Sequence, residues 1–193
     1  MKYDSTAHQS FNKVFSESES PVILTTGSWK DISWQFILAN EGELPPPSEL
    51  CTAAFCVVTF RKRLILIEHA TRGAEFPGGH REVDEDVFSA VKREALEEAG
   101  AIILNPIFFG YKKISPPKPI AHRDVPGASY PFLHSYIPYF YAEAKGMFYT
   151  PSNTEVHSVH LVTVTDAQRL LAPGQKHEVI LEYLLKEKLI DVK

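Results

Sequence analysis

The sequence predicts an α+β protein in which helices pack against a mixed β-sheet. Three observations lead to this class: short apolar runs recur along most of the chain, one long helical stretch lies among them, and a second helical stretch lies near the C-terminus. The order of these elements does not by itself determine the topology of the sheet. With 193 residues, the chain has room for one domain and an extension.

The N-terminal part, residues 1–47, is expected to be this extension, and residues 48–193 are expected to be the main domain. Three consecutive prolines at residues 45–47 prevent regular strand pairing and mark the boundary. Residues 1–20 end in the polar run SESES and are expected to be mobile.

The first regular elements are expected after this tail. Residues 21–40 contain two apolar runs around Gly27, which could form a hairpin or a strand followed by a short helix. The runs CTAAFCVVTF and LILIEHA predict two buried neighbouring strands, joined by a turn at residues 61–63.

A glycine-containing loop then leads into the long helical stretch. Asp84 is the expected N-cap, and Gly100 is the expected stop signal. Strands are predicted again at residues 101–110, 132–144 and 155–164, and helices at residues 166–171 and 176–189. The segment Ser115–Pro131 is a long loop with five prolines, too long to be a simple connection in a compact domain.

Composition limits the partners and the location of the chain. A formal net charge of −4 offers no general attraction for nucleic acid or an anionic membrane. The sequence contains no run of about 18 apolar residues. The N-terminus lacks the apolar core of a signal peptide, and Cys51 and Cys56 are expected on opposite faces of one strand, hence unbridged. These features predict a cytoplasmic protein that binds neither membrane nor nucleic acid.

Glu94, Glu97 and Glu98 crowd one side of the long helix. Like charges at these spacings cost roughly 0.2–0.5 kcal/mol per pair. They lie beside the apolar stripe that should face the sheet. This stripe consists of Phe88, Val91, Ala95 and Ala99. A hard divalent cation such as Mg²⁺ would offset the repulsion, bring phosphates to an acidic chain and activate a water molecule for a glutamate base.

The glutamates are part of a longer pattern. Gly79 is followed after five residues by Glu85, and seven residues later by the run REALEEAGA, residues 93–101. This pattern resembles the Nudix box, the signature of the Nudix hydrolase superfamily with its MutT-like members. Seven fixed positions match, which chance gives on the order of 10⁻⁹ times per start position. Ala95 and Ala101 depart from the family pattern, which usually has larger aliphatic residues there.

The resemblance implies a Nudix fold, a mixed sheet between helices with the box as loop, helix and loop. It implies hydrolysis of a nucleoside diphosphate linked to another moiety, with Mg²⁺ or Mn²⁺ as cofactor. Carried over by position, Glu94, Glu97 and Glu98 are metal ligands and catalytic residues, and the backbone at Gly78–Gly79 offers a further ligand. Three other residues of the box have structural roles: Glu85, Arg93 and Gly100. In this family the base sometimes comes from a later loop, which makes Glu155 a second candidate base.

The favoured substrate is a (d)NTP or an oxidised (d)NTP, because the run between strand and box is as short as in compact nucleotide triphosphatases. An ADP-ribose or nucleotide-sugar pyrophosphatase is the alternative, since Pro116 follows Gly100 by the sixteen residues typical of that subgroup. Its members often form a homodimer through an N-terminal extension. A non-catalytic Nudix-fold ligand-binding protein is an alternative of another class, although the intact box favours an enzyme.

Substrate contacts are expected outside the glutamate cluster as well. The organic part of the substrate is expected to lie against the Ser115–Pro131 loop, which is stiff and positively charged. The candidate substrate-binding residues are Glu75, His80, Lys118, Arg123, Tyr130 and Phe132.

Overall fold

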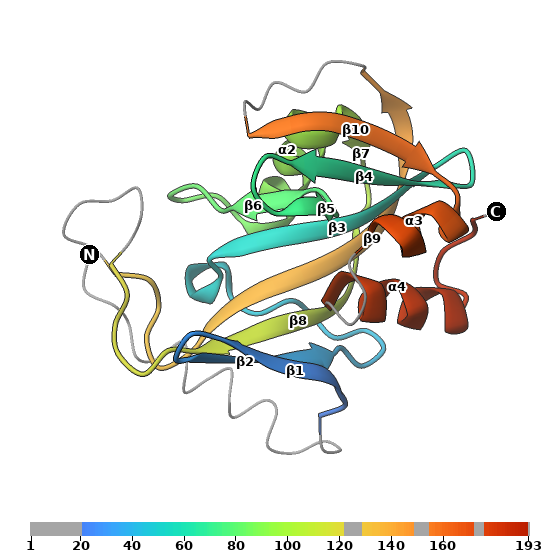
Figure 1. Cartoon of the computed structure of the whole chain (residues 1–193). Helices are drawn as coiled ribbons and strands as arrows, with labels where there is room; N and C mark the ends of the chain where they lie inside the picture. Colours follow the sequence, from blue (N-terminus) through green and yellow to red (C-terminus); the bar gives the residue numbers. More distant parts are fainter. Residues whose placement is uncertain (1–20, 122–128, 149–154, 172–175, 193) are drawn as a thin grey trace.

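The computed structural model describes residues 21–121, 129–148, 155–171 and 176–192. Its strands are β1 (Ile23–Trp29), β2 (Ile32–Leu38), β3 (Ala53–Phe60), β4 (Arg63–His69), β5 (Gly73–Glu75), β6 (Gly78–His80), β7 (Ala101–Ile103), β8 (Ile107–Ser115), β9 (Ser135–Met147) and β10 (Val156–Val162). Its helices are η1 (Ser48–Leu50), a 3₁₀ turn, α2 (Val87–Ala99), α3 (Val164–Leu170) and α4 (Lys176–Lys186). This mixed sheet with helices on both faces confirms the predicted α+β class (Figure 1).

The strands follow the order β1–β2–β8–β9–β3–β4–β10, and the short strands β5, β6 and β7 pair beside this path. Among the strand pairs in the described ranges, only β3 and β9 run parallel. The inner strand β3 is buried at every position except the half-buried Phe60. Such a continuous apolar run is typical of a strand that is covered on both faces.

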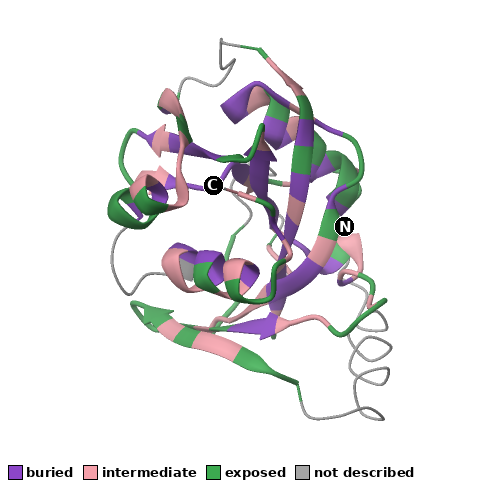
Figure 2. Cartoon of the chain, turned by 90° about the vertical axis from the view of Figure 1, so that its right-hand side faces the viewer, coloured by how far each residue is buried: buried purple, intermediate pink, exposed green. Residues whose placement is uncertain are grey.

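Two apolar cores lie on the two faces of the sheet. Helix α2 packs on one face, and α3 and α4 pack on the other (Figure 1). The inner strands are largely buried, whereas the β1–β2 hairpin at the edge is mostly exposed or half-buried (Figure 2). The first core also contains both cysteines, which are buried and unbridged. The expectation that they lie on opposite faces is wrong, because Cys51 precedes β3 and does not follow its alternation.

The start of α2 differs from the prediction by two residues. Asp86 is the N-cap, because its Oδ1 accepts hydrogen bonds from the backbone N–H groups of Phe88 at 2.9 Å and Ser89 at 3.0 Å. Asp84 instead has a positive φ of 63° and lies in the preceding turn. Gly100 ends the helix in the left-handed conformation with φ 62°, as expected of a glycine stop.

The N-terminal segment around Gly27 forms a hairpin, which decides between the two alternatives left by the sequence. Strand β2 then pairs antiparallel with β8, from Ser33 opposite Ser115 to Leu38 opposite Gly110. Strands β1 and β2, residues 23–38, are therefore part of the same sheet as β8, β9, β3, β4 and β10.

Within the described ranges, no helix has both the length and the apolar character that crossing a bilayer would require.

Candidate active site

Two adjacent glycines bring the backbone of β6 close to α2. Gly78 has φ 153°, and a Cβ there would collide with the carbonyl oxygen of Ala54 on β3. A Cβ on Gly79 would come within 2.6 Å of Glu94 Oε1. Residues without side chains are therefore needed where β6 passes between β3 and the carboxylates of α2.

Glu98 is buried, with only 3% of its surface exposed. Its Oε2 accepts a hydrogen bond from the backbone N–H of Gly78 at 2.8 Å. Burial raises the pKa of Glu98 to about 7, although the hydrogen bond from Gly78 lowers it in part. This carboxyl group is thus poorly solvated, which favours binding of either a proton or a cation.

Glu94 and Glu97 differ in burial. Glu94 is 6% exposed, and burial raises its pKa against the opposing charge of Arg93. The side chain of Glu97 is 42% exposed and lies at the rim. Two of the three glutamates therefore lie at the border of the buried helix face.

The apolar stripe of α2 is displaced slightly from the predicted one. Phe88 is exposed, although its ring still contacts Phe140 with centroids 5.2 Å apart. Val87 and Ala90 lie in the core instead, together with the predicted Val91, Ala95 and Ala99.

Arg93 connects the loop before the helix to the carboxylates. Its Nε and Nη2 donate to the two carboxylate oxygens of Glu85, each at 3.0 Å. Its Nη1 donates to Glu94 and to Glu97 at 3.0 Å, and Nη2 also donates to the carbonyl oxygen of His80 at 2.9 Å. The hydrogen bonds to Glu85 hold the pKa of Arg93 above its ordinary range.

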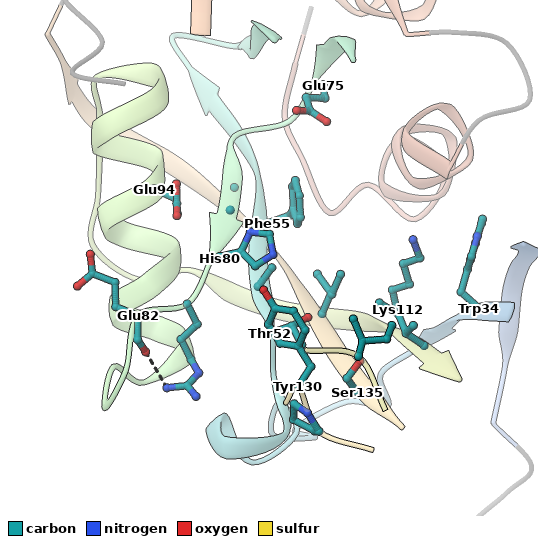
Figure 3. A pocket seen from close by; sticks show the side chains of 18 of the residues that line it. Trp34, Thr52, Phe55, Glu75, His80, Glu82, Glu94, Lys112, Tyr130 and Ser135 are labelled. Atoms are coloured by element: carbon teal, nitrogen blue, oxygen red, sulfur yellow. Dashed lines mark hydrogen bonds between the residues drawn. The ribbon is translucent and has the colours of Figure 1, made fainter. Parts of the chain in front are cut away.

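One pocket of about 930 Å³ extends from the glutamates of α2 to the β1–β2 hairpin at the edge of the sheet (Figure 3). Its lining includes ten of the candidate site residues singled out in the sequence: Glu75, Gly78, Gly79, His80, Arg93, Glu94, Glu97, Glu98, Tyr130 and Glu155. The rings of His80 and Tyr130 lie with centroids 6.0 Å apart. Pro116, Ile120, Tyr130 and Pro131 bring the Ser115–Pro131 loop into the same lining.

Two other candidates, Lys118 and Phe132, are not brought to this pocket. Lys118 is exposed and Phe132 is half-buried, and neither lines the cavity. Arg123 and residues 1–20 lie outside the described residues.

The structure adds lining residues that the sequence reasoning missed. They are Trp29, Ile32 and Trp34 from the β1–β2 hairpin and Ile114 from β8; Lys112 of β8, which flanks the predicted loop, lines the pocket as well. The period-2 alternation of Ile32 and Trp34 was a usable signal for a shared strand face. The pairing of β2 with β8, which carries that face to the pocket, was not readable from the sequence.

Two further pairs of interacting side chains lie at the pocket wall. Arg72 donates from Nε and Nη2 to Glu75 Oε1 at 2.9 Å and 2.6 Å. His69 accepts the backbone N–H of Thr71 at Nδ1, so a neutral ring carries its proton on Nε2, which lies 3.4 Å from Glu155 Oε2. Glu155 is therefore oriented by a buried histidine.

The donors suit a hard cation by their chemistry. Glu94, Glu97 and Glu98 are all oxygen donors, as Mg²⁺ prefers. In the part of the chain that the structure describes, no three His, Cys, Asp or Glu side chains are grouped as they would be around a metal ion. Arg93 holds Glu94 and Glu97, and the Gly78 N–H holds Glu98.

Comparison with known proteins agrees with this geometry. The family model described as NUDIX domain matches residues 50–183, more than two thirds of the chain. No curated protein sequence matches the chain.

Two solved structures have the same fold. The pyrophosphohydrolase BsRppH from Bacillus subtilis superposes with a TM-score of 0.57 at 18% identity, covering 85% of this chain and 97% of that one. The NUDIX domain of NrtR from Shewanella oneidensis, solved with ADP ribose, gives a TM-score of 0.53 at 15% identity, covering 72% and 88%. With the box, the fold and the family model in agreement, this chain belongs to the Nudix hydrolase family.

Proposed function

We propose that the chain hydrolyses a nucleoside diphosphate linked to another moiety, in a reaction that depends on Mg²⁺ or Mn²⁺. The observation that carries the proposal is the pair of buried carboxylates, Glu94 and Glu98, placed against the Gly78–Gly79 backbone at one end of a large pocket. Burying two acidic groups side by side is costly unless a cation or protons offset their charge.

The residues that would hold the cation are Glu94, Glu97 and Glu98, with a backbone carbonyl at Gly78–Gly79 as an additional oxygen donor. When bound, such a cation would polarise a phosphoryl oxygen and lower the pKa of an attacking water molecule. Burial raises the pKa of Glu98 to about 7, and a cation bound beside this carboxyl group would favour its charged form.

The chain's own residues orient the reaction. Arg93 braces the loop through Glu85 and keeps Glu94 and Glu97 in place. One carboxylate at the pocket takes the proton of the attacking water, and the candidates are the box glutamates and Glu155. Glu155 is the more exposed candidate, half open to solvent and oriented by His69.

Two substrate classes fit this chemistry. A (d)NTP or an oxidised (d)NTP is the first candidate, from the short run between β4 and the box. An ADP-ribose or nucleotide sugar is the second, and the pocket favours it because the lining extends from α2 to the hairpin β1–β2. The Shewanella NUDIX domain in complex with ADP ribose shows that this fold accommodates such a ligand.

The test is a substrate panel with Mg²⁺ present: (d)NTPs, oxidised (d)NTPs, ADP-ribose and nucleotide sugars, scored for the phosphate-containing products. Turnover of one class by the wild type, and its loss in Glu98→Gln, would support the proposal. Glu182→Gln, on the exposed side of α4, is the matched control. Binding of these compounds without any hydrolysis would instead support the non-catalytic alternative.

A further inference from the structure

We infer that the wall formed by Ile32 and Trp34 of β2 and by Lys112 and Ile114 of β8, here called the β2–β8 wall, binds the nucleobase of the substrate. This inference deepens the proposed function and rests on it, since it assumes a diphosphate held at α2. It assigns the specificity for an aromatic ring to residues of the N-terminal hairpin and of the strand beside it.

Strand register places these four side chains on one face. Trp34 lies opposite Ile114 in the β2–β8 ladder, and Lys112 lies opposite Phe36, two residues along β2. All four line the pocket, whereas Gln35 and Lys113 alternate to the other face and do not. The wall is therefore a continuous surface and not a collection of unrelated contacts.

Trp34 has room to lie flat because Gly27 is its partner on β1. A Cβ on Gly27 would collide with the six-membered ring of Trp34. The Lys112 ammonium group lies 4.6 Å from the centre of the Trp34 ring. This ammonium group already lies over one face of the indole, so a base stacks there when the flexible Lys112 side chain moves to the edge of the base, where it can donate to a ring nitrogen or carbonyl.

The wall lies far from the carboxylates, on the opposite side of the pocket (Figure 3). Strand β6 borders Glu94, and three strands, β3, β9 and β8, lie between it and β2. At about 4.8 Å per strand, the two ends are separated by roughly 19 Å. A diphosphate at the glutamates fills only part of that length, so the rest of the pocket accommodates the organic part of the substrate.

The chemistry of the wall selects among organic groups. A sugar needs hydrogen-bond partners for its hydroxyl groups, whereas this wall consists of one indole, two isoleucines and one ammonium group. Apolar and aromatic surface matches the face of a nucleobase, and the ammonium group of Lys112 can donate to a ring nitrogen or carbonyl.

The chain offers a direct readout of binding, because its two tryptophans, Trp29 and Trp34, both line the pocket. The probes are the α,β-methylene diphosphates of adenosine, guanosine, cytidine and uridine, which resist hydrolysis at that linkage. The matched base-free probe is methylenediphosphonate. Tryptophan fluorescence is recorded with Mg²⁺ present.

We expect at least one nucleoside probe to quench the fluorescence and methylenediphosphonate to leave it nearly unchanged. Trp34→Phe should lose most of this quenching, and Trp29→Phe should retain it. Equal responses to all five probes, or full quenching in Trp34→Phe, would overturn the assignment.

Affinity gives the second test. Trp34→Leu and Lys112→Met should each weaken binding of the best nucleoside probe by about 10-fold, the scale of losing a base–aromatic contact. Gln35→Leu and Lys113→Met change the neighbouring residues on the opposite face and should bind as wild type. Melting curves exclude unfolded variants, and Lys112→Met carries this test alone if Trp34→Leu does not fold.

Kinetics separate this inference from the proposed function. On the best substrate of the panel, both wall variants should raise KM about 10-fold and leave kcat within about 2-fold. Wall variants with wild-type KM on a substrate that is hydrolysed would refute the wall and leave the function intact. Nucleoside binding that depends on Trp34 in a chain that hydrolyses nothing would refute the function and leave the wall intact.

Discussion

One end of the pocket, here called the α2 end, contains Glu94, Glu97 and Glu98, and the other end is the β2–β8 wall. Different interactions hold the side chains in place at these two ends. At the α2 end, Arg93 holds three carboxylates through charged hydrogen bonds, and Glu98 depends on a backbone N–H. At the β2–β8 wall, apolar side chains are positioned by strand register. Charged groups at the first end can change partners when a cation binds, whereas the wall offers a surface that is already formed.

From this difference we expect the α2 end to carry out catalysis and the β2–β8 wall to bind the organic part of the substrate. Changes at the α2 end should act on kcat and on the metal dependence. Changes at the wall should act on KM, as described above.

Removal of the metal should have the largest effect. EDTA is expected to abolish activity, because Arg93 offsets part of the charge of Glu94 but cannot polarise a phosphoryl oxygen or supply an activated water, as a bound divalent cation would. Adding Mg²⁺ at 100 times its Kd should stabilise the fold by about 2.7 kcal/mol and raise Tm accordingly. Calorimetry and an activity assay measure both effects, and activity that survives exhaustive chelation would refute the metal-dependent mechanism.

Glu98→Gln should lower kcat by about 100-fold or more while the protein stays folded. The amide keeps the size of the side chain but loses the charge that would bind the cation, and single electrostatic contacts of this kind are worth about 2.7–4 kcal/mol in the transition state. Steady-state kinetics, beside Glu182→Gln as control, measure the change. Wild-type turnover with wild-type Mg²⁺ dependence would exclude Glu98 from the site.

Arg93→Met should have an intermediate effect, because it removes the cation between Glu85, Glu94 and Glu97. We expect a loss of about 2 kcal/mol in the free energy of unfolding, or about 4–8 °C in Tm. We also expect a kcat reduced by about 10-fold. Arg93→Lys should recover only part of both, since it keeps the charge but loses the two-pronged contact with Glu85. An unchanged Tm would mean that the network contributes nothing to the fold.

Lys118→Ala should have only a small effect. Lys118 is exposed and lies outside the pocket lining, so KM for the best substrate should stay within about 2-fold of the wild type. Lys112→Ala on the wall is the contrasting variant, and KM values of both are compared on one substrate. A large KM change in Lys118→Ala alone would move the recognition surface away from the wall.

Deletion of residues 1–20 is expected to leave kcat/KM nearly unchanged. The described hairpin begins at Ile23 and completes the wall without them. Deleting residues 1–38 should instead raise KM strongly, since it removes Trp34. A comparison of the two truncations, each checked for folding by circular dichroism, measures the contribution of the hairpin.

The residues around the start and the glutamates of α2 were largely predictable from the sequence alone. Glycines, capping residues and glutamates at helical spacing lie within about twenty-five residues of one another, so local geometry is enough to place them together. The class of fold followed from the same kind of local pattern, apolar runs of strand length and two helical stretches. The errors there were small: the N-cap moved from Asp84 to Asp86, and Phe88 turned outward.

The β2–β8 wall, which lies across the pocket from the glutamates, could be recognised only from the tertiary structure. The wall depends on pairing Trp34 with Ile114, residues far apart in the sequence, and on the hairpin that presents Gly27 beneath the indole. Strand pairing over such a separation is selected by burial of whole faces and not by any local motif. Lys118, a candidate chosen for its charge, lies outside the lining of this pocket, because position on a strand face and not residue type decides which side chains meet.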